Sequence, residues 1–597
     1  MEKDKELKRE NDQGRPFIFA DKAYLDLTDA ESVAMEMILS PGVLESEYFL
    51  VMDIYSSANH IHPQGHVGWW QLELDDRLSV SINVEKTDQG IRVTFPSSKG
   101  AQDSWENREM ISGLDEEVLW LHVVLRQSRN RAIAFEDILP VYISSESLGS
   151  ALALQKSLLA DFTHLHDTAW PWYCWPRDVH VCIVTQTFSL PDAVGSFVLD
   201  TCRLLRRSNI PCSIYASRFD PMLRPAVRPV QELLAGRRPK DLVLYNLSIY
   251  DEYFDAIQRL SCRKALYYHG ITPPKYFRVY DGEFVKLCEK AYDHLGKSGG
   301  FDKVAANSVY SAQELQSFAR QMETRGSGSD TAILRAIAPE KAQTTGVRTL
   351  KAIEKASAPS TEPCATLGNT EEEFAEESRV QGKTLVISFP PVLNPRTWEM
   401  IETEDVQLPN KGTMLLYVGR VAPHKKIEDL ITLQFEYLKL DPDSHLVIVG
   451  KPQFPGYVAY LEYLLETKYK HAQITFLHNL RRGQLKAVYT RSSAYVSMSE
   501  HEGFCVSLIE AMYFGKPIFA YAQPAVRQTL GESGKVFFRK DFGVIADEIF
   551  RLLNNQTEMD HLVAVQSRRF NEIAVQADGR AIWRLLEDLV FGDASVT

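Results

Sequence analysis

The stretch SMSEHEGFCVSLIEAMYFGKP, residues 497–517, decides how the C-terminal part of this chain is interpreted. Its pattern predicts an apolar strand that ends near Met498, a short loop through Gly503 and a helix that begins close to Val506. The first N–H groups of a helix lack intrahelical partners, and together with the helix dipole they form an anion site. Gly503 has no Cβ, so the backbone can approach a ligand closely there. The stretch therefore predicts a site for a diphosphate.

Two glutamates flank this predicted anion site. Glu502 precedes it, whereas Glu510 lies about a turn and a half into the helix, so we do not expect them to act as one carboxylate pair. One carboxylate can face a sugar at the phosphate end, and the other can accept hydrogen bonds from ribose hydroxyls. Taken alone, this spacing is common, and two solvated glutamates beside a helix start are the alternative interpretation.

A second polar loop, YVGRVAPHKK at residues 417–426, follows the first predicted strand of the same half. Arginine offers a forked set of donors and lysine a point charge, so Arg420 and Lys425 together could neutralise a leaving diphosphate. Fixed cations accelerate such a departure because the leaving group gains negative charge in the transition state. In isolation, a surface arginine and lysine would be unremarkable.

Strand and helix patterns alternate over residues 179–395 and again over residues 396–597. Such alternation predicts parallel sheets covered on both faces, and two such halves predict a ligand cleft between them. Residues 324–382 are expected to form a flexible insertion, and residues 581–591 an amphipathic terminal helix. The predicted strands are 180–185, 242–245, 265–268, 304–306 and 384–389 in the first half, and 414–418, 446–449, 474–477, 494–497 and 517–520 in the second.

The first 178 residues have a different character. Residues 1–15 are predicted to be a disordered polar tail. Residues 16–145 are rich in strand patterns, with Leu78, Val80, Ile82 and Val84 on one face, which predicts a β-sandwich-like accessory module. Its role stays open between sugar binding through aromatic residues such as Trp69 and Trp70, protein docking, and scaffolding. Residues 146–178 are predicted to be a helical and aromatic connector.

Composition limits the class of protein. A net charge of -13 argues against a nucleic-acid-binding surface. The eight cysteines contain no CxxC pair, the N-terminus is charged, and no long apolar run occurs, so we expect a cytoplasmic protein. Two candidate metal sites are not favoured. Asp441 and Asp443 are better explained as part of a turn. His60, His62 and His66 are better explained as surface or loop histidines.

The first stretch, read as Glu-Gly-Phe-x4-Ile-Glu-Ala-Met-x2-Gly-x-Pro, resembles the signature of glycosyltransferase family 4. That family also has Gly-Arg after its first C-terminal strand and a lysine five residues beyond, which Gly419, Arg420 and Lys425 match. Lys426 departs from the pattern, because many relatives have glycine or asparagine there. The resemblance covers residues 179–591 without the insertion. It implies an α/β GT-B fold, with two Rossmann-like domains facing a cleft and the β-rich module in front of them.

The N-terminal half carries the partners that this resemblance implies. Gly195 belongs to a strand-to-helix loop that faces the cleft, although relatives often have paired glycines there. His269 lies in the loop YYHGITPP, similar to the loop whose histidine approaches the donor sugar near the reacting carbon. Ser308 lies at a strand-to-helix step, where it could cap the following helix.

The resemblance implies sugar transfer from a nucleotide donor with retention at the anomeric carbon, by front-face attack. Arg420 and Lys425 would carry the leaving group, Glu502 would fix the sugar, Glu510 the ribose, and His269 would orient the reacting sugar. The expected donor site also includes Gly195, Gly419, Gly503, Phe504, Cys505 and Val506.

The expected donor is a UDP- or GDP-linked sugar, and the expected acceptor is a glycan, a lipid-linked glycan or another hydroxyl compound. The resemblance points to polysaccharide or glycoconjugate biosynthesis, without a metal or other cofactor. A peripheral contact with the inner face of the plasma membrane, or with another copy, fits this expectation. Two alternatives stay open: a nucleotide-sugar epimerase, which would need acid and base residues in the cleft, and a non-catalytic sugar-binding or assembly protein.

Overall fold

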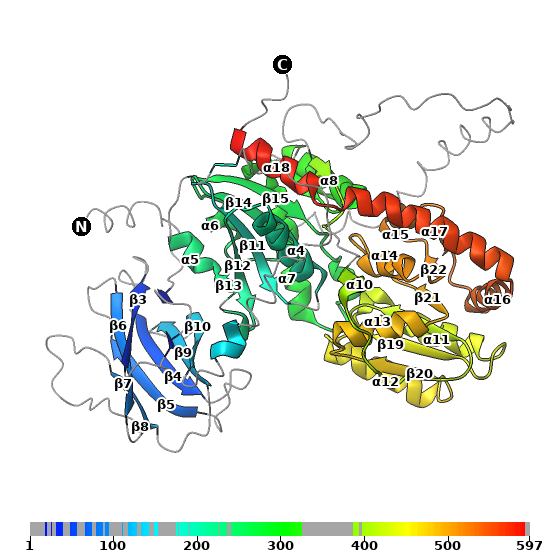
Figure 1. Cartoon of the computed structure of the whole chain (residues 1–597), viewed down its shortest axis with the longest axis horizontal. Coiled ribbons are helices and arrows are strands. Elements are labelled where there is room, and N and C mark those ends of the chain that lie inside the picture. Colours follow the sequence, from blue (N-terminus) through cyan, green and yellow to red (C-terminus); the bar gives the residue numbers. More distant parts are fainter. Residues whose placement is uncertain are drawn as a thin grey trace.

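The computed structural model describes the strands of the N-terminal module, residues 148–152, and residues 175–324, 386–392 and 397–591 with short gaps at 177, 190–191, 225 and 236–239. The predicted tail, most of the connector and nearly all of the predicted insertion lie outside the described residues. So do His60 and His62, while His66, Trp69 and Trp70 are described only by their backbone. Figure 1 shows the order of the parts along the chain.

The N-terminal module contains two five-stranded sheets among the described residues, in the orders β1-β3-β6-β7-β8 and β2-β10-β9-β4-β5. Their pairings are antiparallel except for that of β2 with β10. The strands are β1 (Ile18–Ala20), β2 (Leu25–Asp26), β3 (Ser32–Leu39), β4 (Tyr48–Tyr55), β5 (His66–Glu73), β6 (Ser79–Thr87), β7 (Gly90–Thr94), β8 (Met110–Ile111), β9 (Val118–Gln127) and β10 (Ile133–Tyr142).

The next part, the N-terminal α/β unit, is built on a seven-stranded parallel sheet in the order β13-β12-β11-β14-β15-β16-β17. Apolar runs explain its central strands, since every residue of β14 is buried. The strands are β11 (Val181–Phe188), β12 (Cys212–Phe219), β13 (Val227–Pro229), β14 (Leu242–Leu247), β15 (Arg263–Tyr268), β16 (Lys303–Ala306) and β17 (Val386–Ser388). The helices are α4 (Ala193–Arg207), α5 (Val230–Ala235), α6 (Phe254–Gln258), α7 (Gly282–Gly296) and α8 (Val309–Thr324).

The C-terminal α/β unit has a six-stranded parallel sheet in the order β20-β19-β18-β21-β22-β23. Its strands are β18 (Met414–Val418), β19 (His445–Val449), β20 (Ile474–Leu477), β21 (Ala494–Ser497), β22 (Ile518–Tyr521) and β23 (Lys535–Phe537). The helices are α10 (Thr397–Met400), α11 (Ile427–Tyr437), α12 (Pro455–Thr467), α13 (Arg482–Arg491), α14 (Val506–Tyr513), α15 (Pro524–Leu530), α16 (Phe542–Leu553), α17 (Gln556–Gln576) and α18 (Arg580–Phe591). Two parallel α/β sheets confirm the coarse fold prediction, a GT-B-like arrangement.

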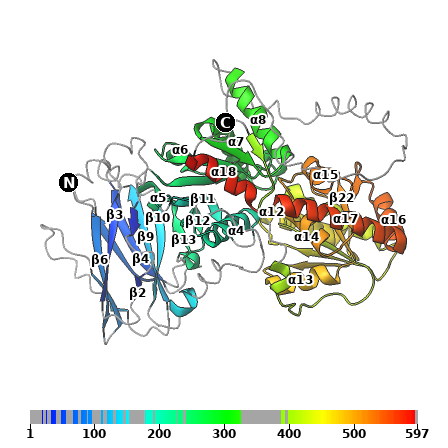
Figure 2. The ribbon, with the colours of Figure 1, turned by 45° about the horizontal axis from the view of Figure 1, so that its top comes forward.

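The last helix crosses back to the first unit, which the predicted boundary at residues 396–597 did not foresee. The apolar face of α18 lies in the core of the N-terminal unit, where Trp583 and Trp175 have ring centroids 5.6 Å apart. Gly579, with φ +94°, makes the turn between α17 and α18. Figure 2 shows α17 beside the C-terminal unit and α18 beside the N-terminal one. The chain thus links the two units twice.

No helix among the described residues is long and apolar enough to span a bilayer.

Candidate functional site

Three loops at the carboxyl ends of parallel strands carry the predicted site residues. The His loop, residues 269–273, follows β15; the cation loop, residues 419–426, follows β18; and the Glu loop, residues 498–505, joins β21 to α14. In open parallel sheets, ligands bind outside these carboxyl ends.

Glu502 and Lys425 form an ion pair that joins the Glu loop to the cation loop. Lys425 Nζ lies 2.6 Å from Glu502 Oε2, and the two side chains are 13% and 8% exposed. Lys425 is the last residue of a short 3-10 helix, Pro423–Lys425. Two residues that were assigned to different parts of a ligand are therefore paired with each other in this structure.

Arg420 lies on the same loop as Lys425 but is exposed. One of its guanidinium nitrogens donates to Gln453 Oε1 at 3.4 Å, which is a long contact. Gly419 before it donates its N–H to the Val449 carbonyl. A Cβ at Gly419 would lie 2.6 Å from the Tyr417 hydroxyl oxygen, so glycine allows this turn to pack.

Lys426 ends the cation loop in the left-handed region, with φ 55°. This conformation favours glycine and asparagine, the residues that the family pattern has at this position. Its ammonium group pairs with Glu428 at 2.8 Å, whereas that of Lys425 pairs with Glu502.

The start of α14 is where the sequence predicts an anion site. Its N-cap, Cys505, has a left-handed backbone with φ 66°, and its side chain makes no capping hydrogen bond. Phe504 and Val506 flank it and are partly exposed. Burial raises the pKa of the Cys505 thiol, so the thiol is neutral and adds no negative charge at the helix start.

Glu510 lies within α14 and is held by a residue that sequence reasoning missed. Tyr489, on α13, donates its hydroxyl to Glu510 Oε2 at 2.8 Å, and its ring stacks on Phe514. Burial raises the pKa of Glu510, while Tyr489 and the Arg482 charge act in the opposite direction. The tyrosine is 21 residues away in sequence, and no local pattern marks it as a partner.

His269 is held in one tautomer by Asn246, also missed from sequence. The Asn246 amide nitrogen donates to the carbonyls of Val184 and Leu244, at 3.1 and 3.4 Å, so its Oδ1 faces His269 Nε2 at 3.0 Å and accepts that N–H. Burial lowers the pKa of His269 to about 3. The imidazole is therefore neutral near pH 7. It can orient a ligand through a hydrogen bond, but it does not act as a cation.

The His loop and the Glu loop touch, although they come from different units. Asn307 Nδ2 donates to the His269 carbonyl at 2.9 Å, and Ser308 Oγ donates to the Gly503 carbonyl at 2.8 Å. A Cβ on Gly503 would lie 2.2 Å from the His269 oxygen. The close approach that Gly503 permits is thus to the other unit, not to open space for a ligand. Ser308 also accepts the N–H of Ser311, so it caps α8 as predicted.

Gly195 serves packing within its own unit. A Cβ there would lie 2.0 Å from the Ser189 carbonyl oxygen, so glycine lets the start of α4 approach the loop that precedes it. Asp192, the N-cap of α4, makes no side-chain capping bond. Gly195 therefore lies in the first turn of α4, not in the strand-to-helix loop in which the sequence pattern placed it.

Two buried histidines lie near the Lys425–Glu502 pair. The rings of His424 and His501 have centroids 6.3 Å apart, and each has one ring nitrogen without a protein partner, Nδ1 and Nε2 respectively. Burial, with the Lys425 charge, lowers the pKa of His501 to about 3 and that of His424 well below its ordinary value. Both rings are therefore neutral near pH 7, so they add no positive charge beside Lys425.

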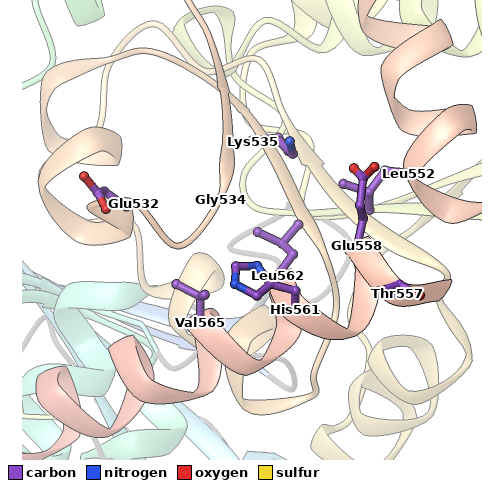
Figure 3. Close-up of a pocket in the computed structure, with 9 residues that line it drawn as sticks. All are labelled: Glu532, Gly534, Lys535, Leu552, Thr557, Glu558, His561, Leu562 and Val565. Atoms are coloured by element: carbon purple, nitrogen blue, oxygen red, sulfur yellow. The ribbon is translucent and has the colours of Figure 1, made fainter. Parts of the chain in front are cut away.

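Metal-ligating clusters of three or more residues do not occur in the described part of the chain. Asp441 instead accepts the N–H groups of Thr413 and Asp443, so the Asp-Pro-Asp sequence forms the predicted turn. A cavity of about 460 Å³ lies elsewhere, between α16, α17 and the segment before β23 (Figure 3). None of the predicted donor-binding residues lines it.

Comparison with known proteins adds to this geometry. Residues 401–569 match the family model for glycosyl transferases group 1. This glycosyl transferase match contains Arg420, Lys425, Glu502 and Glu510, whereas His269 and Gly195 lie outside it.

Two curated relatives are 28% identical to parts of the chain. The first is the O-antigen chain mannosyltransferase RfbU of Salmonella typhimurium, over 142 residues, which are 24% of this chain and 38% of the relative. The second is the GDP-mannose:cellobiosyl-diphosphopolyprenol alpha-mannosyltransferase of Xanthomonas oryzae pv. oryzae, over 171 residues, 27% of this chain and 44% of the relative. The chain therefore spans less than half the length of these relatives. Among solved structures, Anabaena HepE in complex with UDP and glucose aligns with a TM-score of 0.45 and 12% identity, over 68% of this chain and 99% of that one.

Proposed function

We propose that this protein is a retaining glycosyltransferase of family 4 that moves a sugar from a UDP- or GDP-linked donor to a glycan, a lipid-linked glycan or another hydroxyl acceptor. The observation that carries the proposal is the Lys425–Glu502 ion pair, which lies inside the matched glycosyl transferase region. It puts the predicted phosphate cation and the predicted sugar carboxylate at one point. The curated relatives are named as mannosyltransferases, which supports sugar transfer in glycan biosynthesis.

Donor binding would exchange partners within this pair. The diphosphate takes over the Lys425 ammonium group, because a dianionic group at a helix start attracts it more strongly than one carboxylate does. Glu502 then becomes free to accept hydrogen bonds from sugar hydroxyls. The exposed Arg420 adds a second cation for the leaving group, and the N–H groups at the start of α14, beside Phe504 and Cys505, add donors.

The other site residues would hold the two ends of the donor. Glu510, kept in place by Tyr489, accepts hydrogen bonds from the ribose hydroxyls. Neutral His269 orients the reacting sugar, since its Nε2 proton is taken by Asn246 and its other ring nitrogen can only accept. Retention follows from front-face attack, in which the leaving phosphate accepts the proton of the acceptor hydroxyl.

We also propose that transfer needs no metal, because Arg420, Lys425 and the helix start together can neutralise the diphosphate. The acceptor class implies work at the cytoplasmic face of a membrane as a peripheral protein. Residual transfer in the presence of a chelator would support the first point, and sedimentation with anionic vesicles would test the second.

The decisive experiment is a thermal-shift screen of the full chain with UDP, GDP, ADP and their common sugar conjugates, followed by turnover assays with the nucleotide that binds. A ligand that binds only the native state raises the melting temperature by mass action. We expect one nucleotide to do so selectively, with the shift lost in Glu510→Ala and kept in the exposed control Glu283→Gln. The anomeric configuration of the product, read by NMR, tests retention. No shift with any nucleotide at millimolar concentration would refute the proposal and favour a non-catalytic role.

A further inference from the structure

Beneath the His loop lie two buried tyrosine hydroxyls and one partly buried carboxyl group that the proposed reaction does not use. Tyr268 is the last residue of β15, Tyr292 lies on α7 and Glu314 lies on α8. Both tyrosines are buried, and both point their hydroxyls at the Glu314 carboxyl and at the backbone of Ile271. Ile271 is the central residue of the His loop and is itself buried.

Both backbone groups of Ile271 end on this set. Its N–H donates to the Tyr268 hydroxyl at 2.8 Å, and that hydroxyl donates to Glu314 Oε2 at 2.6 Å. Its carbonyl accepts from the Tyr292 hydroxyl at 3.2 Å, and Tyr292 lies 3.5 Å from Glu314 Oε1. A single side chain, Glu314, therefore meets both the tyrosine that accepts from the Ile271 N–H and the tyrosine that donates to the Ile271 carbonyl.

The protonation state of Glu314 decides the direction of each bond, since every hydroxyl has one proton to donate. The Tyr292 hydroxyl has one proton, so it cannot donate both to Ile271 and to an ionised Glu314. If Glu314 carries a proton on Oε1, it donates to Tyr292, and Tyr292 is free to donate to the Ile271 carbonyl. The bonds then run in one direction from the Ile271 N–H through Tyr268, Glu314 and Tyr292 to the Ile271 carbonyl.

We propose that Glu314, in its protonated form, closes a ring of hydrogen bonds through Tyr268 and Tyr292 that fixes Ile271, and that it is thereby a positioning residue for the His loop. The carbonyl of His269, the first residue of the loop, lies against Gly503 of the other unit. The ring thereby also fixes the contact between the two units. Buried and fully satisfied polar networks of this kind hold one conformation, whereas partly satisfied ones do not.

The surroundings of Glu314 shift it toward the protonated form. Burial raises its pKa to about 7, and hydrogen bonds from Tyr268 and Tyr292 only partly oppose this. The other titratable groups on this side are Tyr310 on α8 itself and Cys288 on α7 behind Tyr292, both with pKa values raised by burial. All four neighbours are neutral near pH 7, so Glu314 is the one that titrates.

The first test measures hydrogen exchange of the Ile271 amide and its loop neighbours in the full chain, between about pH 6 and about pH 8.5, corrected for intrinsic rates. In the wild type, ionised Glu314 attracts the Tyr292 proton away from Ile271, so protection should fall by roughly fivefold, the weight of one net hydrogen bond. Glu314→Gln accepts from Tyr268 and donates to Tyr292 at any pH, so it should keep the loop protected throughout. Glu314→Leu should lose protection at every pH.

Further variants separate positioning from folding. Tyr292→Phe removes the acceptor branch alone, so it should remove the pH dependence while leaving the rest of α7 protected. Glu283→Gln is the matched control, because it makes the same charge change at an exposed site of α7. Unchanged loop exchange in Glu314→Leu and Tyr292→Phe, or a Glu314→Gln variant that still responds to pH, would overturn the proposal.

The second test rests on the proposed function and measures transfer. The wild-type kcat should fall as Glu314 ionises above about pH 7, with KM for the donor little changed, because His269 is displaced and the nucleotide contacts are not. Glu314→Gln should flatten this profile. The exchange experiment needs no turnover, so a chain without transferase activity would defeat the proposed function and still test the ring. A chain that transfers sugar but whose loop exchange does not depend on pH would refute the proposed ring and leave the proposed function intact.

Discussion

The Lys425–Glu502 pair offers the sharpest test of the site. Removing one partner of a buried ion pair costs about 3–5 kcal/mol, because the other charge is left unpaired. Here 13% and 8% of the side chains remain exposed, so we expect about 2–3 kcal/mol for Lys425→Met or Glu502→Gln, less than for a fully buried pair. A domain of about 150–250 residues, the size of the C-terminal α/β unit, loses about 2–4 °C of melting temperature per kcal/mol. Each single variant should therefore melt about 4–12 °C below the wild type.

A double-mutant cycle separates the pair from the two residues. The variant with both changes should be more stable than the sum of the single losses predicts, with a coupling of about 1 kcal/mol or more, because neither charge is then unpaired. The control cycle uses Lys439 and Glu436, a more exposed pair with 59% and 27% of the side chains exposed. Exposed pairs contribute about 0–1 kcal/mol. Melting by calorimetry provides the stabilities of all seven proteins, since the two cycles share the wild type.

Stabilisation by a bound nucleotide provides a second measurement on the same pair, in which the two single variants should behave in opposite ways. Glu502→Gln leaves Lys425 without a carboxylate partner, so UDP or GDP without a sugar should stabilise this variant at least as much as the wild type. Lys425→Met should lose most of the stabilisation by the same nucleotide. Additive single losses below about 0.5 kcal/mol, as for surface substitutions, or a nucleotide shift that survives in Lys425→Met, would refute the partner exchange.

Three further predictions concern the backbone and the histidine. Gly503→Ala should destabilise the chain by about 1–3 kcal/mol, since its Cβ would lie 2.2 Å from the His269 oxygen, whereas Gly543→Ala, with 3.7 Å to its nearest atom, should not; melting curves compare them. Cys505→Gly should be about 1 kcal/mol more stable than Cys505→Ala in denaturant titrations, because φ is 66°. The pKa of His269 is lowered to about 3 in the folded chain. The stability that the neutral imidazole contributes to folding is therefore fully present above the ordinary pKa of histidine, and it is lost as the pH falls from that value toward 3. His269→Gln should shrink that acid-side loss, measured as melting temperature against pH.

Local patterns in the sequence predicted the main elements around the site. The Glu loop lies between β21 and α14, as predicted from an apolar segment, a glycine and a helical pattern. These signals were readable because all of them lie within about 20 consecutive residues. Strands β13 and β23, each three residues long, were missed. Strand β12 was missed as well, and we attribute this to its mixed sequence, CSIYASRF.

The partners of the site residues could not be predicted in the same way. Asn246 meets His269 from β14, Tyr489 meets Glu510 from α13, and Asn307 meets the His loop from the end of β16. Each contact depends on which strand ends are neighbours in the folded sheet, and single-sequence periodicity does not contain that order. For the same reason, the amphipathic pattern of α18 predicted a helix but not the sheet that it covers.

The arrangement of the two units relates these contacts to the proposed reaction. The Glu loop is fixed on one side by Lys425 from its own unit and on the other by Ser308 and the His269 backbone from the opposite unit. A diphosphate that removes Lys425 from Glu502 would free the carboxylate while leaving the contact across the units in place. The sugar would then meet Glu502 and His269 at a junction that is already assembled. Under this mechanism, donor binding changes the partners of charges and does not have to bring the two loops together, so a variant that weakens the Ser308–Gly503 bond should lower kcat more than it weakens nucleotide binding.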